Sequence, residues 1–158
     1  EEALEQTLYN LQLSIEDSGA VITHDPLPEI GANPVQMTQL FQNLISNALK
    51  FRSERTPQIH IGAQRERNHW HLTVADNGIG IESEYLERIF MIFQRLHGRQ
   101  EYPGTGIGLA ICRKIVDKHG GRIYAESTPG EGTTFHILIP LKRSYRRNAS
   151  GNYSNPLG

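Results

Sequence analysis

A chain of 158 residues can form one domain that buries a hydrophobic core without disulfides or a structural metal. Its charge is nearly balanced, with 16 Lys and Arg against 17 Asp and Glu, so the composition favours neither nucleic acid nor an anionic membrane surface as a partner. The single cysteine excludes an internal disulfide and fits a reducing compartment, so we expect a cytoplasmic protein without membrane contact.

The N-terminal part is an acidic amphipathic segment that starts without Met, and we expect the chain to be a piece of a longer protein. Apolar residues at helical spacing predict a helix from Glu1 to about Asp17, which Gly19 ends. Residues 20–24 then predict a short strand. The proline-rich segment 25–28 indicates a sheet edge or a turn.

The next helix has clear boundary signals and is expected to run to about Phe51. Asn33 can cap its first turn, Pro34 suits the first helical position, and Gln36 stands where a capping box has Glu or Gln. The apolar residues of the segment fall on one face, namely Met37, Phe41, Leu44, Ile45, Ala48 and Leu49.

The other side of this helix carries a polar stripe of Asn43, Asn47 and Lys50, spaced about one turn apart. Two amides and an ammonium offer carbonyl oxygens to a hard cation and hydrogen-bond donors to anionic oxygens. A solvated helix face would show the same stripe, so the stripe by itself leaves both interpretations open.

Alternating segments at 58–64 and 69–75 predict a β-hairpin whose charged loop is 65–68. A helical pattern follows over residues 82–93, and residues 94–103 are polar and aperiodic. The 94–103 segment is therefore expected to be a mobile loop.

The C-terminal part begins with a helix that follows Gly104 and ends at Gly120. Residues 122–127 and 133–140 predict two further strands joined by a turn. The sequence then becomes basic and rich in Asn, Ser and Gly, so we expect one domain over residues 1–143 and a disordered tail over 144–158.

Asp76 stands at the end of a predicted strand and is followed by Asn-Gly-Ile-Gly. An ionised carboxylate only accepts hydrogen bonds, so it would favour the exocyclic amine of adenine and oppose the carbonyl of guanine. Gly78 and Gly80 would let the backbone approach a flat ligand. An ordinary Asp-Asn-Gly turn is the alternative.

The glycine-rich stretch 104–109 supplies backbone amides at the start of a helix, where phosphate oxygens bind well. It is not a P-loop, because the chain contains no Gly-Lys-Ser or Gly-Lys-Thr. A dinucleotide fingerprint would follow a strand directly, whereas a polar loop with Tyr102 and Pro103 precedes this stretch. A Rossmann oxidoreductase is therefore disfavoured.

In order and spacing these pieces resemble the catalytic, ATP-binding domain of the sensor histidine kinases. The matches are the N box at 43–51, the G1 box at 76–80, the F box at 89–95, the G2 box at 104–111 and the last glycine turn at 130–135. Residues 93–97 and 101–108 are most similar to bacteriophytochrome-type and related cyanobacterial kinases. The resemblance implies an α/β (α+β) fold, a two-layer sandwich of a mixed β-sheet covered by helices known as the Bergerat ATP-binding fold.

The resemblance also implies ATP and Mg²⁺ as cofactors. Asn47 and Asn43 would hold the Mg²⁺ that bridges the phosphates, Lys50 would contact phosphate oxygens, and Asp76 would accept from the adenine amine. Phe51 would pack against adenine, although a core position is its alternative. In the lid over the nucleotide, Arg95 and His97 would be available to the phosphates, with a solvated loop histidine as the alternative for His97. Further nucleotide contacts are implied for Gly78, Gly80, Ile81, Phe93, Gly104, Thr105, Gly106, Gly108, Leu109 and Thr133.

The reaction implied is phosphoryl transfer to a histidine rather than hydrolysis. Relatives that hydrolyse ATP, such as mismatch-repair ATPases and type II topoisomerases, place a Glu one turn before the metal-binding Asn. Here that residue is Asn43, which cannot act as a general base. We therefore expect Asn43, Asn47, Lys50 and Arg95 to act on the transferred group.

None of the seven histidines has the surroundings of the family's phosphoacceptor box. We thus expect the acceptor to be a separate dimerisation domain, with a response regulator as the indirect partner. The chain alone is expected to be monomeric and not to phosphorylate itself. The alternatives are a nucleotide-dependent regulatory binding module and an anti-sigma-like serine kinase. The kinase interpretation requires Asn47, Lys50 and Asp76 to surround one nucleotide.

Overall fold

The computed structural model describes residues 2–30, 32–86, 88–90, 106–141, 146–147 and 153–154. Its α-helices are α1 (Glu2–Asn10), α2 (Gln12–Ser18), α3 (Pro34–Lys50) and α4 (Gly106–Lys118). Two short 3-10 helices are η1 (Ser83–Tyr85) and η2 (Arg88–Phe90). The main strands are β1 (Val21–His24), β2 (Gln58–Arg65), β3 (His69–Asp76), β4 (Arg122–Thr128) and β5 (Gly132–Pro140).

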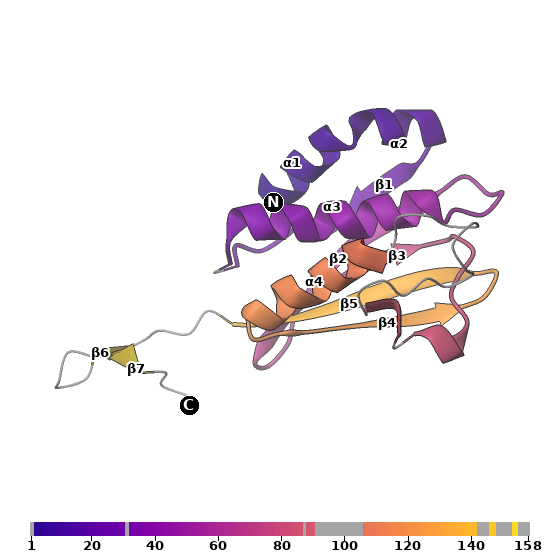
Figure 1. Cartoon of the computed structure of the whole chain (residues 1–158). Coiled ribbons are helices and arrows are strands. Elements are labelled where there is room, and N and C mark those ends of the chain that lie inside the picture. Colours follow the sequence, from indigo (N-terminus) through magenta and orange to yellow (C-terminus); the bar gives the residue numbers. More distant parts are fainter. Residues whose placement is uncertain are drawn as a thin grey trace.

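The five main strands form one mixed sheet in the order β1-β2-β3-β5-β4. β1 pairs in parallel with β2, and the other neighbours are antiparallel. Figure 1 shows α3 and α4 on one face of the sheet. α1 and α2 lie next to α3, on the side away from α4. The predicted two-layer sandwich is therefore confirmed, and each predicted strand is found within one residue of its expected bounds.

The hydrophobic core lies between the sheet and the helices α3 and α4. The helices present apolar side chains on one face at a spacing of three to four residues, and the strands present them at alternate residues. Its fully buried members include Leu44 and Ile45 of α3, Ile61 of β2, Val74 of β3 and Val116 of α4. Removing a large side chain from such a core typically costs about 2–5 kcal/mol, so this layer holds α3 firmly over the strands.

One of the two hydrogen bonds of the predicted capping box forms at the start of α3. The Asn33 side chain accepts a hydrogen bond from the Gln36 backbone N–H at 3.1 Å. In a capping box the Gln36 side chain would accept from the Asn33 N–H. Here the Asn33 N–H donates instead to Nε2 of His119, at 3.2 Å. His119 can accept there since its Nδ1 is paired with the Ile115 carbonyl at 2.8 Å. This contact ties the beginning of α3 to the end of α4.

Two predicted helices differ in the structure. The N-terminal one is divided at Leu11, whose φ of −100° and ψ of 9° depart from helical values, and Gly19 ends α2 with a φ of 69°. The helical pattern over 82–93 was expected to give one helix, but its described part consists of η1 and η2. Residues 87 and 91–93 lie outside the described residues.

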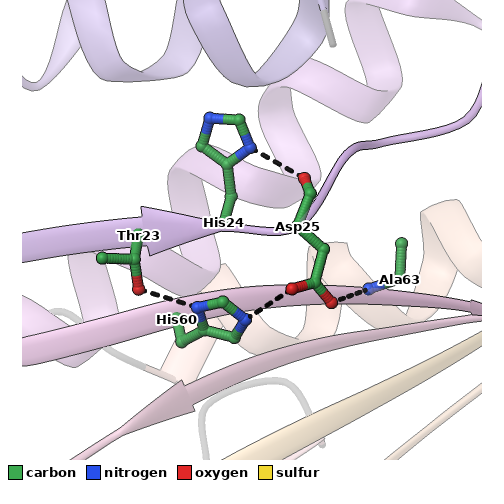
Figure 2. A network of polar contacts seen from close by, with 5 residues as sticks. All are labelled: Thr23, His24, Asp25, His60 and Ala63. Atoms are coloured by element: carbon green, nitrogen blue, oxygen red, sulfur yellow. Dashed lines mark hydrogen bonds and ion pairs between the residues drawn. The ribbon is translucent and has the colours of Figure 1, made fainter.

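The edge strand β1 is held to β2 by a side-chain network as well as by the parallel ladder (Figure 2). His60 lies between the Thr23 hydroxyl, 2.7 Å from its Nδ1, and Asp25 Oδ1, 3.0 Å from its Nε2. The second Asp25 oxygen accepts from the Ala63 N–H at 3.2 Å, and His24 Nδ1 contacts the Asp25 carbonyl. These contacts lower the Asp25 pKa, chiefly through the Ala63 N–H bond.

Beyond the sheet, β6 (Arg146–Arg147) and β7 (Tyr153–Ser154) form a short antiparallel pair. Both lie in the segment 144–158 for which we expect disorder, and the remaining residues of that segment are outside the described residues.

Candidate functional site

The C-terminal end of α3 contacts the turn that follows β3, which brings two of the predicted boxes together. The Phe51 carbonyl accepts a hydrogen bond from the Ile79 N–H at 3.0 Å. A Cβ added to Gly78 would lie only 2.4 Å from that carbonyl oxygen. Gly78 is thus required by the close approach of the α3 end, whereas the sequence suggested a ligand as the reason.

Gly80 is required by a second backbone contact. Its φ is +78°, a conformation that side chains disfavour, and an added Cβ would lie 2.4 Å from the Thr128 carbonyl oxygen. The turn after β3 is consequently packed between the end of α3 and the turn that joins β4 to β5.

The carboxylate of Asp76 is oriented by amides from both of these turns. Its Oδ1 accepts from the Gly78 N–H at 2.8 Å and from the Thr133 N–H at 3.3 Å. No donor among the described residues reaches Oδ2. Burial raises the pKa of Asp76, and the two amide bonds only partly oppose that shift. The side chain therefore presents one oxygen that is fixed and one that is available to a hydrogen-bond donor.

The hydroxyl of Ser127 links the same two turns, a role that the sequence analysis missed. Ser127 Oγ accepts from the Ile81 N–H at 2.6 Å and lies 2.8 Å from the Gly132 carbonyl and 2.9 Å from Thr133 Oγ1. A carbonyl can only accept, so Ser127 donates to Gly132 and the Thr133 hydroxyl donates to Ser127. No local signal could have found this, because Ile81 and Ser127 are 46 residues apart in sequence.

The polar stripe of α3 is divided between different surroundings. The Asn43 side-chain NH₂ donates a long hydrogen bond, 3.4 Å, to the Gly108 carbonyl in the first turns of α4. Asn47 is half-buried, and its side-chain amide has no hydrogen-bond partner within the described part of the chain. Lys50 is exposed at the end of the helix.

Two hollows lie near these residues. One of about 270 Å³ is lined by Asp76 and the β4–β5 turn. Another of about 280 Å³ is lined by Lys50, Arg52 and residues of α2, including Asp17. Lys50 and Asp76 line different hollows among the described residues, so the expectation that Asn47, Lys50 and Asp76 surround one nucleotide stays a prediction that rests on the sequence motif.

The remaining predicted contacts fall into three groups. The side chains of Ile81, Leu109 and Thr133 are buried, with 7%, 5% and 6% of their surfaces exposed. Gly106 begins α4, and a Cβ added to Gly108 would meet nothing within 4 Å among the described residues, which leaves this backbone open to a ligand. The predicted contacts Phe93, Arg95, His97, Gly104 and Thr105 and the lid 94–103 lie outside the described residues.

The donor set suits a magnesium nucleotide better than a metal held by protein alone. Among the described residues, no group of three or more His, Cys, Asp and Glu could hold a metal ion. Mg²⁺ commonly takes only one or two protein oxygens and completes its shell with water and substrate phosphates. The Asn47 side-chain amide, which has no hydrogen-bond partner among the described residues, fits that mode of binding.

Residues 32–143 match the sequence profile of the histidine kinase-, DNA gyrase B- and HSP90-like ATPases. The chain belongs to this family. Within it, the chain is a histidine kinase catalytic domain of the two-component systems, as the relatives below show.

Cyanobacterial phytochrome A of Nostoc sp. (strain PCC 7120 / SAG 25.82 / UTEX 2576) is 55% identical over 157 residues, which are 98% of this chain and 20% of that protein. The chain thus spans about a fifth of the length of this relative. The expected likeness to cyanobacterial phytochrome-type kinases is confirmed.

Solved structures agree in fold. The catalytic domain of histidine kinase ThkA, in a nucleotide-free form, matches with a TM-score of 0.73 and 26% identity over 89% of this chain and 92% of that one. Full-length ShkA in complex with AMPPNP matches with a TM-score of 0.76 and 25% identity over 90% of this chain and 30% of that one. Within its described residues, the kinase domain has no helix long and apolar enough to span a bilayer.

Proposed function

We propose that this domain binds Mg²⁺ and ATP beside the end of α3, and donates the γ-phosphate to a histidine on a separate dimerisation domain. The observation that carries the proposal is the Asp76 carboxylate, whose Oδ1 is held by the Gly78 and Thr133 amides while Oδ2 has no donor among the described residues.

Adenine would be selected by this carboxylate. The exocyclic amine of adenine can donate to Oδ2, whereas guanine would present a carbonyl oxygen to the same atom and be repelled. Because Asp76 is largely buried, an unpaired or repelled partner would be costly, which makes the discrimination strong.

The phosphates and the metal would lie between α3 and α4. Asn47 and Asn43 would supply amide oxygens to Mg²⁺, and the backbone at Gly108 would face phosphate oxygens. Lys50 lines a hollow beside α2, so its contact with the phosphates is proposed from the sequence motif. Bound Mg²⁺ would neutralise charge that develops on the transferred group. Full-length ShkA, part of which shares this fold, was solved in complex with AMPPNP, and this supports nucleotide binding by the fold.

Transfer is favoured over hydrolysis because Asn43 is an amide. Its NH₂ group donates to the Gly108 carbonyl, and an amide is too weak a base to take a proton from water. The phosphoryl group would then pass to the acceptor histidine of the dimerisation domain, and from there to a response regulator.

The test supplies this chain with Mg²⁺, γ-labelled ATP and a histidine-kinase dimerisation domain that carries a phosphoacceptor histidine. We expect acid-labile phosphohistidine on the dimerisation domain and no stable label on the catalytic chain alone. A dimerisation domain whose phosphoacceptor histidine is replaced by Gln serves as the control. Label on a serine would favour an anti-sigma-like kinase, and nucleotide binding without any transfer would favour a regulatory binding module.

A further inference from the structure

The guanidinium of Arg55 connects the two turns that hold Asp76, although Arg55 itself lies outside the predicted boxes. Its Nη2 donates to the Asn77 carbonyl at 2.7 Å and also lies 3.2 Å from the carbonyl oxygens of Gly130 and of Glu131. Its Nε contacts the Ser53 hydroxyl at 3.3 Å. One side chain from the segment after α3 thus contacts three carbonyls on two separate turns.

Both turns supply an amide to the Asp76 carboxylate. The turn after β3 contributes the Gly78 N–H, and the β4–β5 turn leads directly into the Thr133 N–H. The turns also meet through one backbone bond, from the Gly130 N–H to the Ile79 carbonyl at 2.7 Å. The spacing between the turns therefore determines where Oδ2 of Asp76 lies.

The Asn77 side chain fixes the segment from which Arg55 projects. Its Nδ2 donates to the Thr56 carbonyl at 3.0 Å, and its Oδ1 accepts from the Gln58 N–H at 2.9 Å. Arg55 is exposed, yet its backbone is held on one side by Ser53 and on the other by these Asn77 bonds. A guanidinium held in this way is preorganised to donate, so little of its freedom remains to be lost.

We propose that Arg55 is a positioning residue that sets the preference of the domain for adenine over guanine nucleotides. It does so by holding the two turns at the separation at which Asp76 faces the base. This inference rests on the proposed function, because it concerns the site that we assign to ATP.

The variant Arg55→Gln removes the charge and the fork of donors but keeps a long polar side chain. Without the guanidinium the turns can separate, and the Asp76 carboxylate loses its fixed orientation. We expect the Kd for ATP with Mg²⁺ to rise about fivefold, equivalent to about 1 kcal/mol, because the charge-assisted contacts to the two turns are lost while the backbone bond between the turns remains. The Kd for GTP with Mg²⁺ should change less than twofold, so the ATP-to-GTP selectivity falls.

Both nucleotides are titrated into the 158-residue chain by calorimetry, and thermal unfolding is recorded for each variant. Arg67→Gln, which removes the same charge from the exposed β2–β3 loop at the other end of β3, is the matched control and should leave both affinities unchanged. Arg55→Lys keeps the charge and one donor centre and should give an intermediate ATP affinity.

Equal weakening of ATP and GTP by Arg55→Gln would overturn the selectivity role, since general loosening of the fold affects both. Unchanged ATP affinity in Arg55→Gln would overturn it as well. If the unaltered chain binds no ATP, both the proposed function and this inference are overturned. If the unaltered chain binds ATP but Arg55→Gln weakens ATP and GTP binding equally, only the role of Arg55 is overturned.

Discussion

Nε2 of His71 and Nδ1 of His136 lie 2.7 Å apart on the face of the sheet opposite α3 and α4. The pair continues at both ends, because His71 Nδ1 contacts Glu66 and His136 Nε2 lies 2.7 Å from Glu126 Oε1. The ring of Tyr124 stacks on His136 with centroids 4.6 Å apart. The result is an unbroken chain of hydrogen bonds from the β2–β3 loop to β4.

Burial lowers the pKa of His136, with Glu126 opposing and His71 adding to that shift. The fold therefore favours the neutral imidazole at position 136.

The first prediction concerns pH and stability. The folded-state pKa of His136 is depressed, so its contribution to stability is present above the unfolded pKa of about 6.5 and is lost as pH falls through the lower folded value. Urea unfolding between pH 7.5 and 5 should show a falling free energy, by at most about 1.4 kcal/mol per pH unit for the protonation of His136. His136→Gln should flatten that slope, and an unchanged slope would contradict a lowered pKa of His136 in the fold.

The second prediction is that Asp76→Asn moves stability and binding in opposite directions. Burial raises the pKa of Asp76, so its ionised form is disfavoured in the fold and any contribution to stability is lost as pH rises through the folded pKa. At pH 7, Asn removes this penalty and keeps an oxygen for the two amides. We expect Tm to rise in thermal unfolding, while ATP binds at least about tenfold more weakly and the preference over GTP relaxes. Unchanged affinity for both nucleotides would place adenine recognition elsewhere.

The third prediction tests whether Asn47 contributes to the binding of Mg²⁺. Asn47→Ala removes the one stripe amide that has no hydrogen-bond partner among the described residues, so the fold should tolerate it. ATP affinity measured with and without Mg²⁺ should differ in the unaltered chain and become equal in the variant, a loss of at least about tenfold with Mg²⁺. Asn68→Ala in the β2–β3 loop is the control and should retain the Mg²⁺ effect.

The fourth prediction tests the Ser127 hydroxyl. Ser127→Ala leaves the N–H of buried Ile81 without its 2.6 Å acceptor and removes the link to Gly132 and Thr133. An unpaired buried donor costs about 1–3 kcal/mol, and urea unfolding should show a loss in that range. Ser14→Ala on the exposed side of α2 should change stability by less than about 0.5 kcal/mol. Equal values for the two variants would show that Ser127 contributes no link between the turns.

Local sequence patterns were sufficient to locate the five main strands and α3. These features depend on local rules: alternation for the strands, and Asn33, Pro34 and a broad apolar face for α3. The composition of the boxes was also enough to place Asp76 at a strand end and the glycine stretch at the start of α4.

Which side chains and turns contact one another could be known only from the folded chain. The sequence pattern assigned the acceptor for the Asn33 N–H to Gln36, but His119 supplies it. The sequence suggested that Gly78 makes room for a ligand, whereas it is the Phe51 carbonyl that leaves no room for a side chain there. Ser127 and Arg55 had no sequence signal, because their partners lie on other turns far along the chain. The spacing of apolar residues indicates which side of a single segment is buried. A hydrogen bond between turns that are distant in sequence forms only when the folded sheet brings those turns together.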